Sequence, residues 1–317
     1  MYKNKTVAVV VPAYNEEKLI GQVIETMPGF VDHIVVVEDH GEDNTAELVR
    51  EQYAEKDPER IILIEHEDNQ GVGAAIATGY KWCRDHRIEI AAVMAGDAQM
   101  APADLESLID PVAIGEVDYT KGNRLISGEA WEKIPRIRYL GNASLSFLTK
   151  IASGYWHIAD SQTGYTAASL KVLETINLNG IYKRYGMPND MLVKLNIHNF
   201  RVRDIPIEPV YGVGEESGIK PIRIIPQMSW LILRLFFYRM LQKYIIRDFH
   251  PLVFSYFSGL ILSTIGFVWG LFVVYYRLFI GSLHDNSPLF AVFLLISGWQ
   301  FTLFAMLYDM EYNRHLR

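Results

Sequence analysis

Residues 90–102 read I-A-A-V-M-A-G-D-A-Q-M-A-P, and this stretch decides the fold class. An apolar run of strand length ends in Ala-Gly, and Asp97 follows immediately. Open α/β sheets bind their ligands at the carboxyl ends of the strands. A carboxylate there, between residues too small to block a ligand, suits a hard divalent cation shared with phosphate oxygens. A turn aspartate without a ligand is the alternative, and the remainder of the chain distinguishes the two.

Strand-like and helical segments alternate through the first part of the chain. Each of the first three strand-like runs is followed by a segment with helical periodicity. This alternation is typical of a doubly wound, mostly parallel sheet, so we predict an α/β fold. The four β-branched, apolar runs lie at residues 6–11, 33–37, 60–65 and 90–94.

Polar side chains gather directly after each of these predicted strands. A single carboxylate after one strand is often a helix cap. Four polar clusters at the same edge of one sheet are better explained by a ligand site. The clusters consist of Asn15 and Glu16, Glu38 and Asp39, Gln70 and Gly71, and finally Asp97.

The composition excludes several classes of protein. A chain of 317 residues is long enough for one or two domains, and a formal net charge of -7 argues against binding to nucleic acid. Cys83 is the only cysteine, so no intrachain disulfide can form and a reducing compartment fits. The N-terminal residues lack the apolar core and cleavage site of a signal peptide.

The C-terminal third is much more apolar. Residues 252–276 and 288–308 contain no charged side chain, and each run is long enough to span a bilayer. We predict a hairpin of two transmembrane helices, with two buried helices of a soluble domain as the alternative. The preceding segment mixes apolar and regularly spaced basic residues, which predicts helices in the membrane interface. The predicted domains are residues 1–225, 226–250 and 251–317.

The basic residues near the two runs predict their orientation. Arg277 is the only lysine or arginine in the link between them. By the positive-inside rule, both termini and the N-terminal domain of this integral membrane protein lie in the cytoplasm. The basic residues that flank the hairpin are Arg234, Arg239, Lys243, Arg247, Arg314 and Arg317.

Four segments that follow the predicted strands resemble the successive motifs of family 2 glycosyltransferases. They read VVVPAYNEE (9–17), VVEDHGEDNT (36–45), NQGVGAA (69–75) and AGDAQ (95–99). The resemblance implies a GT-A fold, which is Rossmann-like and binds a nucleotide-sugar, together with a divalent metal, Mg²⁺ or Mn²⁺. Because of the predicted membrane hairpin, the chain is similar within this family to the polyprenyl-phosphate (dolichyl-phosphate) sugar synthases.

The resemblance implies where the donor nucleotide-sugar binds. The family usually has Asp or Asn at the position of Glu38. Gly71 and Gly73 would let phosphate approach the backbone at a helix start. Asp43 and Thr45 are alternatively helix caps, which is the preferred interpretation for Thr45. The expected donor-binding residues are Pro12, Tyr14, Asn15, Glu16, Glu38, Asp39, Gln70, Gly71, Asp97 and Lys220, the last in a polar loop that either closes over the diphosphate or is simply solvated.

Asp97 and Gln99 match the metal-binding segment of the family. The family usually carries Asp-x-Asp here, and this chain has Ala95 in place of the first acid. Asp97 is therefore expected to hold the metal with Gln99, donor phosphates and water. The missing acid leaves the metal affinity, and the metal dependence itself, open.

Later matches imply the acceptor side of the site. Arg124, Arg138 and Asn142 are expected at the acceptor phosphate, because a guanidinium binds phosphate through two parallel hydrogen bonds. A surface salt bridge is the alternative for each arginine. Asp160 and Asp190 are expected to face the sugar or the acceptor, with a helix N-cap as the alternative for Asp190. The expected catalytic residues are Asp97, Asp160, Arg124 and Asp190.

These features predict a membrane-bound, inverting hexosyltransferase. It would move a sugar from a UDP- or GDP-linked donor to a polyprenyl (dolichyl or undecaprenyl) phosphate, and the inversion is implied by the family alone. A lipid phosphate is anionic near neutral pH, so no strong general base is needed. The alternatives are a lipid-linked oligosaccharide or polysaccharide acceptor and a degenerate, non-catalytic membrane scaffold. A homo-oligomer stays open, because hairpin spans of this family can assemble.

Overall fold

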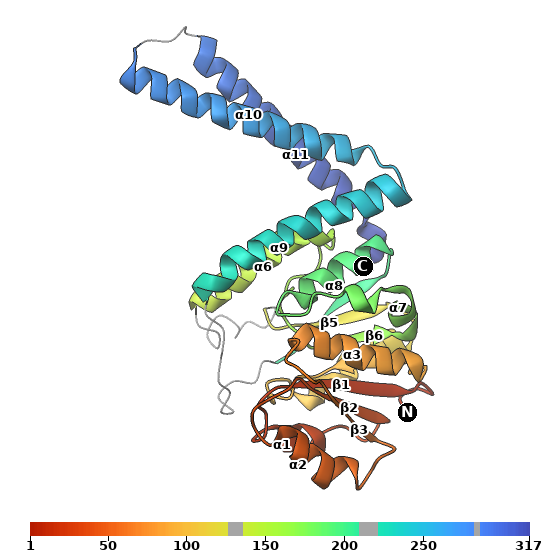
Figure 1. Ribbon diagram of the computed structural model, residues 1–317. Coiled ribbons are helices and arrows are strands. Elements are labelled where there is room, and N and C mark those ends of the chain that lie inside the picture. Colours follow the sequence, from red (N-terminus) through yellow and green to blue (C-terminus); the bar gives the residue numbers. More distant parts are fainter. Residues whose placement is uncertain (126–135, 209–220, 282–285) are drawn as a thin grey trace. The chain divides into compact units, whose positions relative to one another are not determined.

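The computed structural model describes residues 1–125, 136–208, 221–281 and 286–317. They form two compact units, one of Met1–Phe236 with Leu316–Arg317 and one of Phe237–His315. The first unit contains a sheet with helices packed on it, and the second contains two long helices (Figure 1).

The first unit is built on one seven-stranded sheet with the order β3-β2-β1-β4-β6-β5-β7. Strands β3, β2, β1 and β4 are parallel, and so are β5 and β7, whereas β6 runs antiparallel to both of its neighbours. This mixed, mostly parallel sheet confirms the predicted fold class. The strands are β1 Val7–Ala13, β2 His33–Glu38, β3 Ile61–Glu65, β4 Ile90–Val93, β5 Tyr119–Asn123, β6 Thr166–Ser169 and β7 Val202–Pro206.

Helices cover both faces of the sheet, so the central strands are buried on both sides (Figure 1). Continuous apolar runs form such strands because neither face meets water. A Cβ atom on Gly79 would lie 2.2 Å from Cγ1 of Val10, so a helix can pack this close to β1 only through glycine. The helices are α1 Ile20–Glu25, α2 Thr45–Val49, α3 Val72–Asp85, α4 Leu105–Ala113, α6 Arg136–Ser153, α7 Leu170–Thr175 and α8 Met187–Ile197, with short 3-10 or π-helical turns at Arg50–Ala54, Pro102–Asp104 and Leu178–Gly180.

Helix α9, Pro221–Leu241, begins in the first unit and ends in the second. Met228, Leu231 and Leu235 pack against α8, while Trp230 is 70 % exposed. The helix thus has one apolar face that packs on the domain and a second that stays exposed. This agrees with the interfacial location expected for residues 226–250. That location stays a prediction. A π-helical turn, Gln242–Arg247, follows the helix.

The second unit contains α10, Leu252–Phe279, and α11, Asn286–Tyr312, followed by a 3-10 turn at Arg314–Leu316. Both helices are long and apolar enough to cross a membrane, with mean hydropathy of 2.1 and 1.9. They pack closely, because Cβ atoms on Gly259 and Gly298 would lie 2.4 Å from Oγ1 of Thr302 and Oγ of Ser263. The two predicted apolar helices and their mutual contact are thus confirmed.

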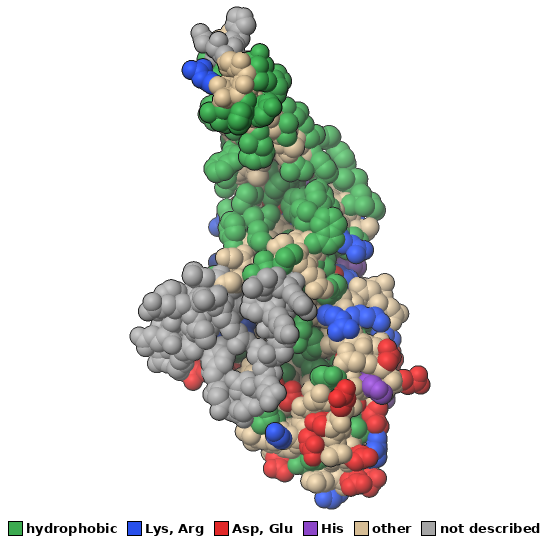
Figure 2. Space-filling view, turned by 60° about the vertical axis from the view of Figure 1, so that its left-hand side comes forward, with side chains coloured by type: hydrophobic (Ala, Val, Ile, Leu, Met, Phe, Trp, Pro, Cys, Tyr) green, Lys and Arg blue, Asp and Glu red, His purple; other side chains and the backbone are tan. Residues whose placement is uncertain are grey.

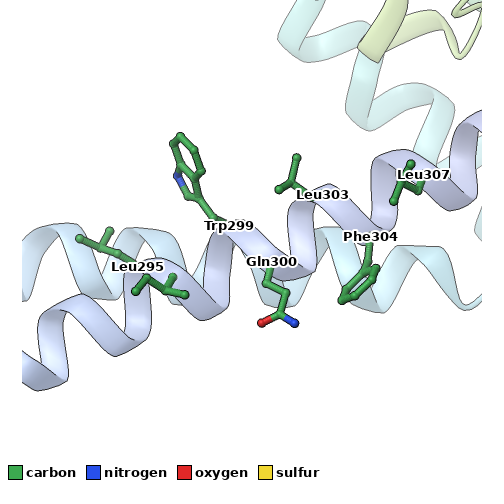
Figure 3. Close-up of a pocket in the computed structure, with 7 residues that line it drawn as sticks. Leu295, Trp299, Gln300, Leu303, Phe304 and Leu307 are labelled. Carbon is green, nitrogen blue, oxygen red and sulfur yellow. The ribbon is translucent and has the colours of Figure 1, made fainter.

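Most of the surface of this hairpin is apolar. Figure 2 shows hydrophobic side chains over α10 and α11 on the visible face. In a close-up of α11, Trp299 and Leu303 point to one side of the helix and Gln300 and Phe304 to the other (Figure 3). Trp299 is 70 % exposed and Leu303 54 %. Large uncovered apolar surfaces of this kind favour contact with lipid or protein over contact with water.

A buried ion pair joins the end of α9 to the C-terminal part of α11. The guanidinium of Arg239 donates to both carboxylate oxygens of Asp309 at 2.8 and 2.9 Å, and neither side chain has exposed surface. The hydroxyl of Tyr244 donates to the same carboxylate, and the ammonium of Lys243 donates to Oδ1 of Asn313 at 2.8 Å. These bonds fix the segment that precedes the hairpin to the C-terminal end of α11.

Candidate active site

The sheet order brings the predicted polar clusters to one edge. Strands β2, β1 and β4 are neighbours, and Ala13 at the end of β1 pairs with Glu38 at the end of β2. The backbone N–H of Gly96, after β4, donates to the carbonyl of Pro12 at 3.2 Å. The loops that carry Asn15 and Asp97 therefore leave the sheet side by side.

Asp39 is buried and holds the loop that follows β3. One of its oxygens accepts hydrogen bonds from the backbone N–H of Gln70 at 2.9 Å and from Nδ1 of His66 at 2.7 Å. The other accepts from the N–H of Gly71 at 2.7 Å. A carboxylate only accepts, so Nδ1 of His66 carries a proton, and its Nε2 lies 2.9 Å from the hydroxyl of Thr78. Asp39 thus fixes the backbone of this loop at Gln70 and Gly71.

Glu38 is also buried, and its carboxylate bends back onto its own turn. Its oxygens accept from the N–H of Gly41 at 2.6 Å and of His40 at 3.1 Å. The extra methylene relative to Asp lets the carboxylate reach this far. Oδ1 of Asn15 accepts from the N–H of Glu42 at 2.7 Å, which ties the loops after β1 and β2 together.

Thr45 does not cap α2, so the preferred interpretation of this residue was wrong. It is the first residue of the helix and fully buried, and its hydroxyl accepts from the N–H of Glu16 at 2.9 Å. The same hydroxyl donates to Asp43 at 2.5 Å, and Asp43 also accepts from the N–H of Glu17. The pair therefore positions the backbone around Glu16. Local sequence could not reveal this, because the partner is 29 residues away.

Glu16 and Asp97 bring two carboxylates together at this edge. A Cβ on Gly96 would lie 3.4 Å from Cγ of Glu16, so the Glu16 side chain crosses the bare backbone between Ala95 and Asp97. Burial, together with the charges of Asp97 and Asp43, raises the pKa of Glu16 to about 7. Oδ1 of Asp97 accepts from the backbone N–H of Gln99 at 3.1 Å.

The residues described here contain no group of three or more His, Cys, Asp or Glu side chains that could hold a metal ion. The two carboxylates of Glu16 and Asp97 can therefore supply only part of a coordination shell. Mg²⁺ is often bound by one or two carboxylates together with phosphates and water, so this donor set fits such an ion. Glu16, from the loop that follows β1, is thus the second acid beside Asp97, on a chain that has Ala95 where the family usually has an acid.

The glycines at the start of α3 are approached by the protein's own backbone. The carbonyl of Lys183 accepts from the N–H of Gly73 at 2.9 Å and of Ala74 at 3.2 Å. A Cβ on Gly71 would lie 2.6 Å from that carbonyl, and Gly71 has a φ of +97°. The Lys183 ammonium also donates to Oε1 of Gln70 at 3.3 Å. The close approach expected for phosphate at this helix start is thus made by a peptide carbonyl.

Asp190 is buried in the first turn of α8 and supports the segment that carries Lys183. Its carboxylate accepts from the N–H of Tyr182 at 2.8 Å and forms an ion pair with Lys194. Its side chain does not cap its own helix. In this position Asp190 holds the backbone at Tyr182, next to Lys183.

Arg124 and Asp160, two of the expected acceptor-side residues, form a two-pronged ion pair. Nε and Nη2 of Arg124 donate to the two carboxylate oxygens at 2.8 and 3.2 Å. Asp160 has no exposed surface, whereas the Arg124 side chain is 21 % exposed. Burial opposes ionisation, but the charge and hydrogen bonds of Arg124 hold the pKa of Asp160 below its usual range.

Of the remaining expected residues, two lie in β1 or directly after it, and the side chains of three lie outside the described residues. Tyr14 is 45 % exposed, and Pro12 is buried in β1. Arg138 and Asn142 lie on α6, but their side chains are outside the described residues, as is Lys220. Sequence reasoning missed His66, Lys121 and Asp204. A charged residue in the middle of a buried strand was the available signal for Lys121.

Comparison with known proteins gives a family and a fold. Residues 8–176 match the family described as "Glycosyl transferase family 2". The chain is 30 % identical over 219 residues to UDP-N-acetylglucosamine--dolichyl-phosphate N-acetylglucosaminyltransferase of Methanococcus voltae, covering 66 % of this chain and 87 % of that protein. It is 29 % identical over 218 residues to polyprenol monophosphomannose synthase of Mycolicibacterium smegmatis, covering 66 % and 80 %.

Among solved structures, the chain resembles glucosyl-3-phosphoglycerate synthase from Mycobacterium tuberculosis in complex with Mn²⁺, UDP and glucosyl-3-phosphoglycerate. The TM-score is 0.53 and the identity 18 %, over 74 % of this chain and 80 % of that one. At this identity the likeness concerns the fold.

Proposed function

This chain belongs to glycosyl transferase family 2, and we propose that it transfers a sugar from a nucleotide-diphosphate sugar to a polyprenyl phosphate at a membrane surface. The observation that carries the proposal is that one chain combines a nucleotide-sugar fold with two exposed apolar helices. Relatives at about this similarity are named for dolichyl-phosphate and polyprenol acceptors. An apolar hairpin brings a soluble donor and a water-insoluble acceptor to the same enzyme.

The donor would lie along the edge formed by the ends of β1, β2 and β4. Asn15, Glu38 and Asp39 fix the loops around its nucleotide, as their backbone hydrogen bonds indicate. Asp39 would act mainly by holding the N–H groups of Gln70 and Gly71 in place. A pocket whose walls are fixed before binding loses less entropy when the ligand arrives.

A divalent ion, Mg²⁺ or Mn²⁺, fits the carboxylates of Glu16 and Asp97, with donor phosphates and water as further ligands. Gln99 stays a predicted ligand. When bound, such an ion supplies positive charge that offsets the charge of the departing diphosphate. Lys220 is expected to add to the same effect.

The transfer would be a single displacement. A phosphate oxygen of the acceptor forms a bond to the anomeric carbon, and the bond from that carbon to the donor diphosphate breaks. The attacking phosphate is already anionic, so no proton needs to be removed. Asp160, which is paired with Arg124, therefore need not act as a general base. Arg124, Arg138 and Asn142 would hold the acceptor phosphate, and inversion is the expected outcome of one displacement.

Incubation of the detergent-solubilised chain with UDP- and GDP-sugars, Mn²⁺ and polyprenyl phosphate tests this function. A glycolipid product, detected by mass spectrometry, is the expected result. A product on lipid-linked oligosaccharide alone would replace the proposed acceptor. If no donor gives a product and no nucleotide shifts the unfolding temperature, the enzyme hypothesis fails and the chain is a non-catalytic scaffold.

We also infer that the sheet domain faces the cytoplasm, since basic residues flank the outer ends of both apolar helices. A cleavable tag inserted between α10 and α11 should be cut in intact cells by a protease added outside them. A tag at the N-terminus should be cut only after lysis. The opposite pattern would reverse the topology.

A further inference from the structure

Lys121 is a buried cation in the middle of β5. Its side chain is 1 % exposed, and its ammonium donates a hydrogen bond to the carbonyl of Thr163. Burial lowers the pKa of this ammonium to about 8, and the charges of Asp160 and Asp204 work in the opposite direction. A lysine is rarely placed where it loses its hydration unless nearby acids compensate.

The charges of two carboxylates, Asp204 and Asp160, act on this lysine. Asp204 on β7 pairs with Lys121 in the register of the sheet, and one of its oxygens accepts from Nδ2 of Asn123 and from the N–H of Ala159, both at 2.6 Å. Within the described part of the chain, the other oxygen of Asp204 is buried without a hydrogen-bond partner. Asp160 is the second carboxylate, and it is fully buried.

The four charges of this cluster balance, with Lys121 and Arg124 against Asp160 and Asp204. The two cations differ in depth. Lys121 is buried, whereas the side chain of Arg124 is 21 % exposed and reaches the surface. If Arg124 turned toward an acceptor phosphate, Asp160 would stay behind with no exposed surface of its own. A buried carboxylate that loses its only cation is strongly disfavoured. Lys121 is a second cation, and because it is buried it stays in place and compensates the charge of Asp160 when Arg124 turns away.

We propose that Lys121 is a positioning residue: it is the permanent counter-charge of Asp160 and thereby allows Arg124 to exchange that carboxylate for the acceptor phosphate. This role rests on the proposed function only in the identity of the anion that Arg124 receives. The ammonium does not touch substrate. It fixes the turn that carries Asp160 through its hydrogen bond to the carbonyl of Thr163. It also balances the negative charge of Asp160 while Arg124 moves.

A chemical experiment tests the release of Arg124 without any substrate. Phenylglyoxal modifies an arginine more slowly the more firmly an ion pair holds it, and peptide mass spectrometry gives the rate at each one. In Lys121→Met, Arg124 is the one cation left for Asp160 among the residues that the structure describes, so its labelling should slow at least fivefold. Arg203, on the surface beside Glu116, is an internal standard whose rate should not change. Lys121→Arg should restore the Arg124 rate, and equal rates in wild type and Lys121→Met would overturn the proposal.

The double variant Lys121→Met/Asp204→Asn guards against a failure to fold. It removes one charge of each sign, and the amide oxygen of Asn can still accept from Asn123 and Ala159. Arg124 should remain slow to label in this variant. A rate restored to the wild-type value would mean that Lys121 serves Asp204 rather than Asp160, which contradicts the proposal.

Steady-state kinetics separate this role from a structural one. Lys121→Met should raise the KM for polyprenyl phosphate at least tenfold, with kcat and nucleotide affinity close to wild type. A fall in kcat and in thermal stability with an unchanged KM would make Lys121 a purely structural residue. If wild-type protein transfers sugar to no phosphate acceptor, the proposed function fails, whereas the labelling result still decides the role of Lys121.

Discussion

Arg124 and Asp160 bind each other through two parallel hydrogen bonds, so a predicted phosphate ligand and a predicted catalytic acid are partners in this structure. The pair holds Asp160 ionised and fixes the planar guanidinium where an acceptor phosphate is expected. A carboxylate engaged in this way is suited to orient an arginine rather than to remove a proton. This geometry agrees with an anionic nucleophile that needs no base.

Arg124→Lys tests the fork-like geometry of this pair. The charge remains, but a single ammonium cannot bridge both oxygens of Asp160 at once. We expect kcat/KM for polyprenyl phosphate to fall roughly 10- to 100-fold, as for loss of one charged hydrogen bond. The dissociation constant of the donor nucleotide should not change.

Arg203→Lys is the matched control, because Arg203 pairs with Glu116 on the surface at 2.8 Å. It should leave the kinetics unaltered and change the free energy of unfolding by less than about 1 kcal/mol. Full activity of Arg124→Lys would show that the planar fork is not needed.

The stability of the sheet domain should respond to the ionisation of Asp204. Burial raises the pKa of Asp204 to about 6, against the attraction of Lys121 on β5 and with repulsion from Asp160. An acid whose folded pKa is raised contributes stability at low pH, and this contribution is lost as pH rises through the folded value. Asp204→Asn abolishes this loss. Relative to wild type, the variant should therefore gain about 2 kcal/mol between pH 4 and pH 8.

Denaturant titrations of wild type and Asp204→Asn at several pH values measure this difference. Glu116→Gln provides a control of opposite sign, because its hydrogen bond with Arg203 lowers the pKa of Glu116. Its effect on stability should become less favourable as pH rises. A difference between Asp204→Asn and wild type that is constant across the range would mean that Asp204 titrates normally.

The common sheet edge of the polar clusters could be predicted because it depends on local patterns. Apolar β-branched runs form the central strands, and parallel strands present their carboxyl ends at one edge. Asn15, Glu38 and Asp97 each follow such a run directly, so their common edge needed no long-range information. The apolar helices were equally predictable, since length and the absence of charge suffice.

The roles of several side chains depend on contacts that no local pattern contains. Asp39 meets the backbone 31 and 32 residues later, and the start of α3 meets the carbonyl of Lys183. Lys121 faces Asp204 because β5 pairs with β7, two strands that are not consecutive in the chain. The identity of Glu16 as neighbour of Asp97 likewise requires β1 and β4 to be adjacent.

Asp39→Asn should weaken binding of the donor nucleotide. The amide can replace only one of the two acceptor oxygens, so the N–H of Gly71 or Gln70 loses its partner in a buried loop. We expect the dissociation constant for the nucleotide to rise roughly 10- to 100-fold. Calorimetry with UDP and GDP measures it.

His66→Gln is the companion variant, because glutamine retains a donor toward Asp39 and leaves both backbone bonds intact. It should bind nucleotide within about threefold of wild type, a difference of less than 1 kcal/mol. An Asp39→Asn protein with unchanged affinity would mean that the loop is held by other contacts.

The buried pair of Arg239 and Asp309 should matter more to stability than to activity. Removing one partner leaves an uncompensated buried charge, so Arg239→Met should lower the free energy of unfolding by about 3–5 kcal/mol. The double variant Arg239→Met/Asp309→Leu removes both charges and should recover most of this loss. Thermal unfolding in detergent micelles measures both. A double variant less stable than Arg239→Met alone would show that Tyr244 and Asn313 need the carboxylate in its own right.

The absence of an acid at position 95 makes Glu16 the most informative residue for metal binding. Its side chain lies over Gly96 and feels the charge of Asp97, so the loops after two neighbouring strands would supply the carboxylates that Asp-x-Asp supplies from one segment. Glu16→Gln keeps the size of the side chain and removes the charge. With UDP or GDP present, it should weaken Mn²⁺ binding at least about 10-fold, and Asp97→Asn at least as much.

Electron paramagnetic resonance counts free Mn²⁺ directly and does not depend on turnover. Glu17→Gln is the matched control, since Glu17 accepts from the backbone of Asn44 on the other side of the loop and should leave Mn²⁺ affinity unchanged. If Glu16→Gln binds Mn²⁺ as wild type does while Asp97→Asn does not, Asp97 holds the ion with the donor phosphates alone. If neither variant alters Mn²⁺ binding, the metal lies elsewhere, and the two carboxylates serve the donor by hydrogen bonding.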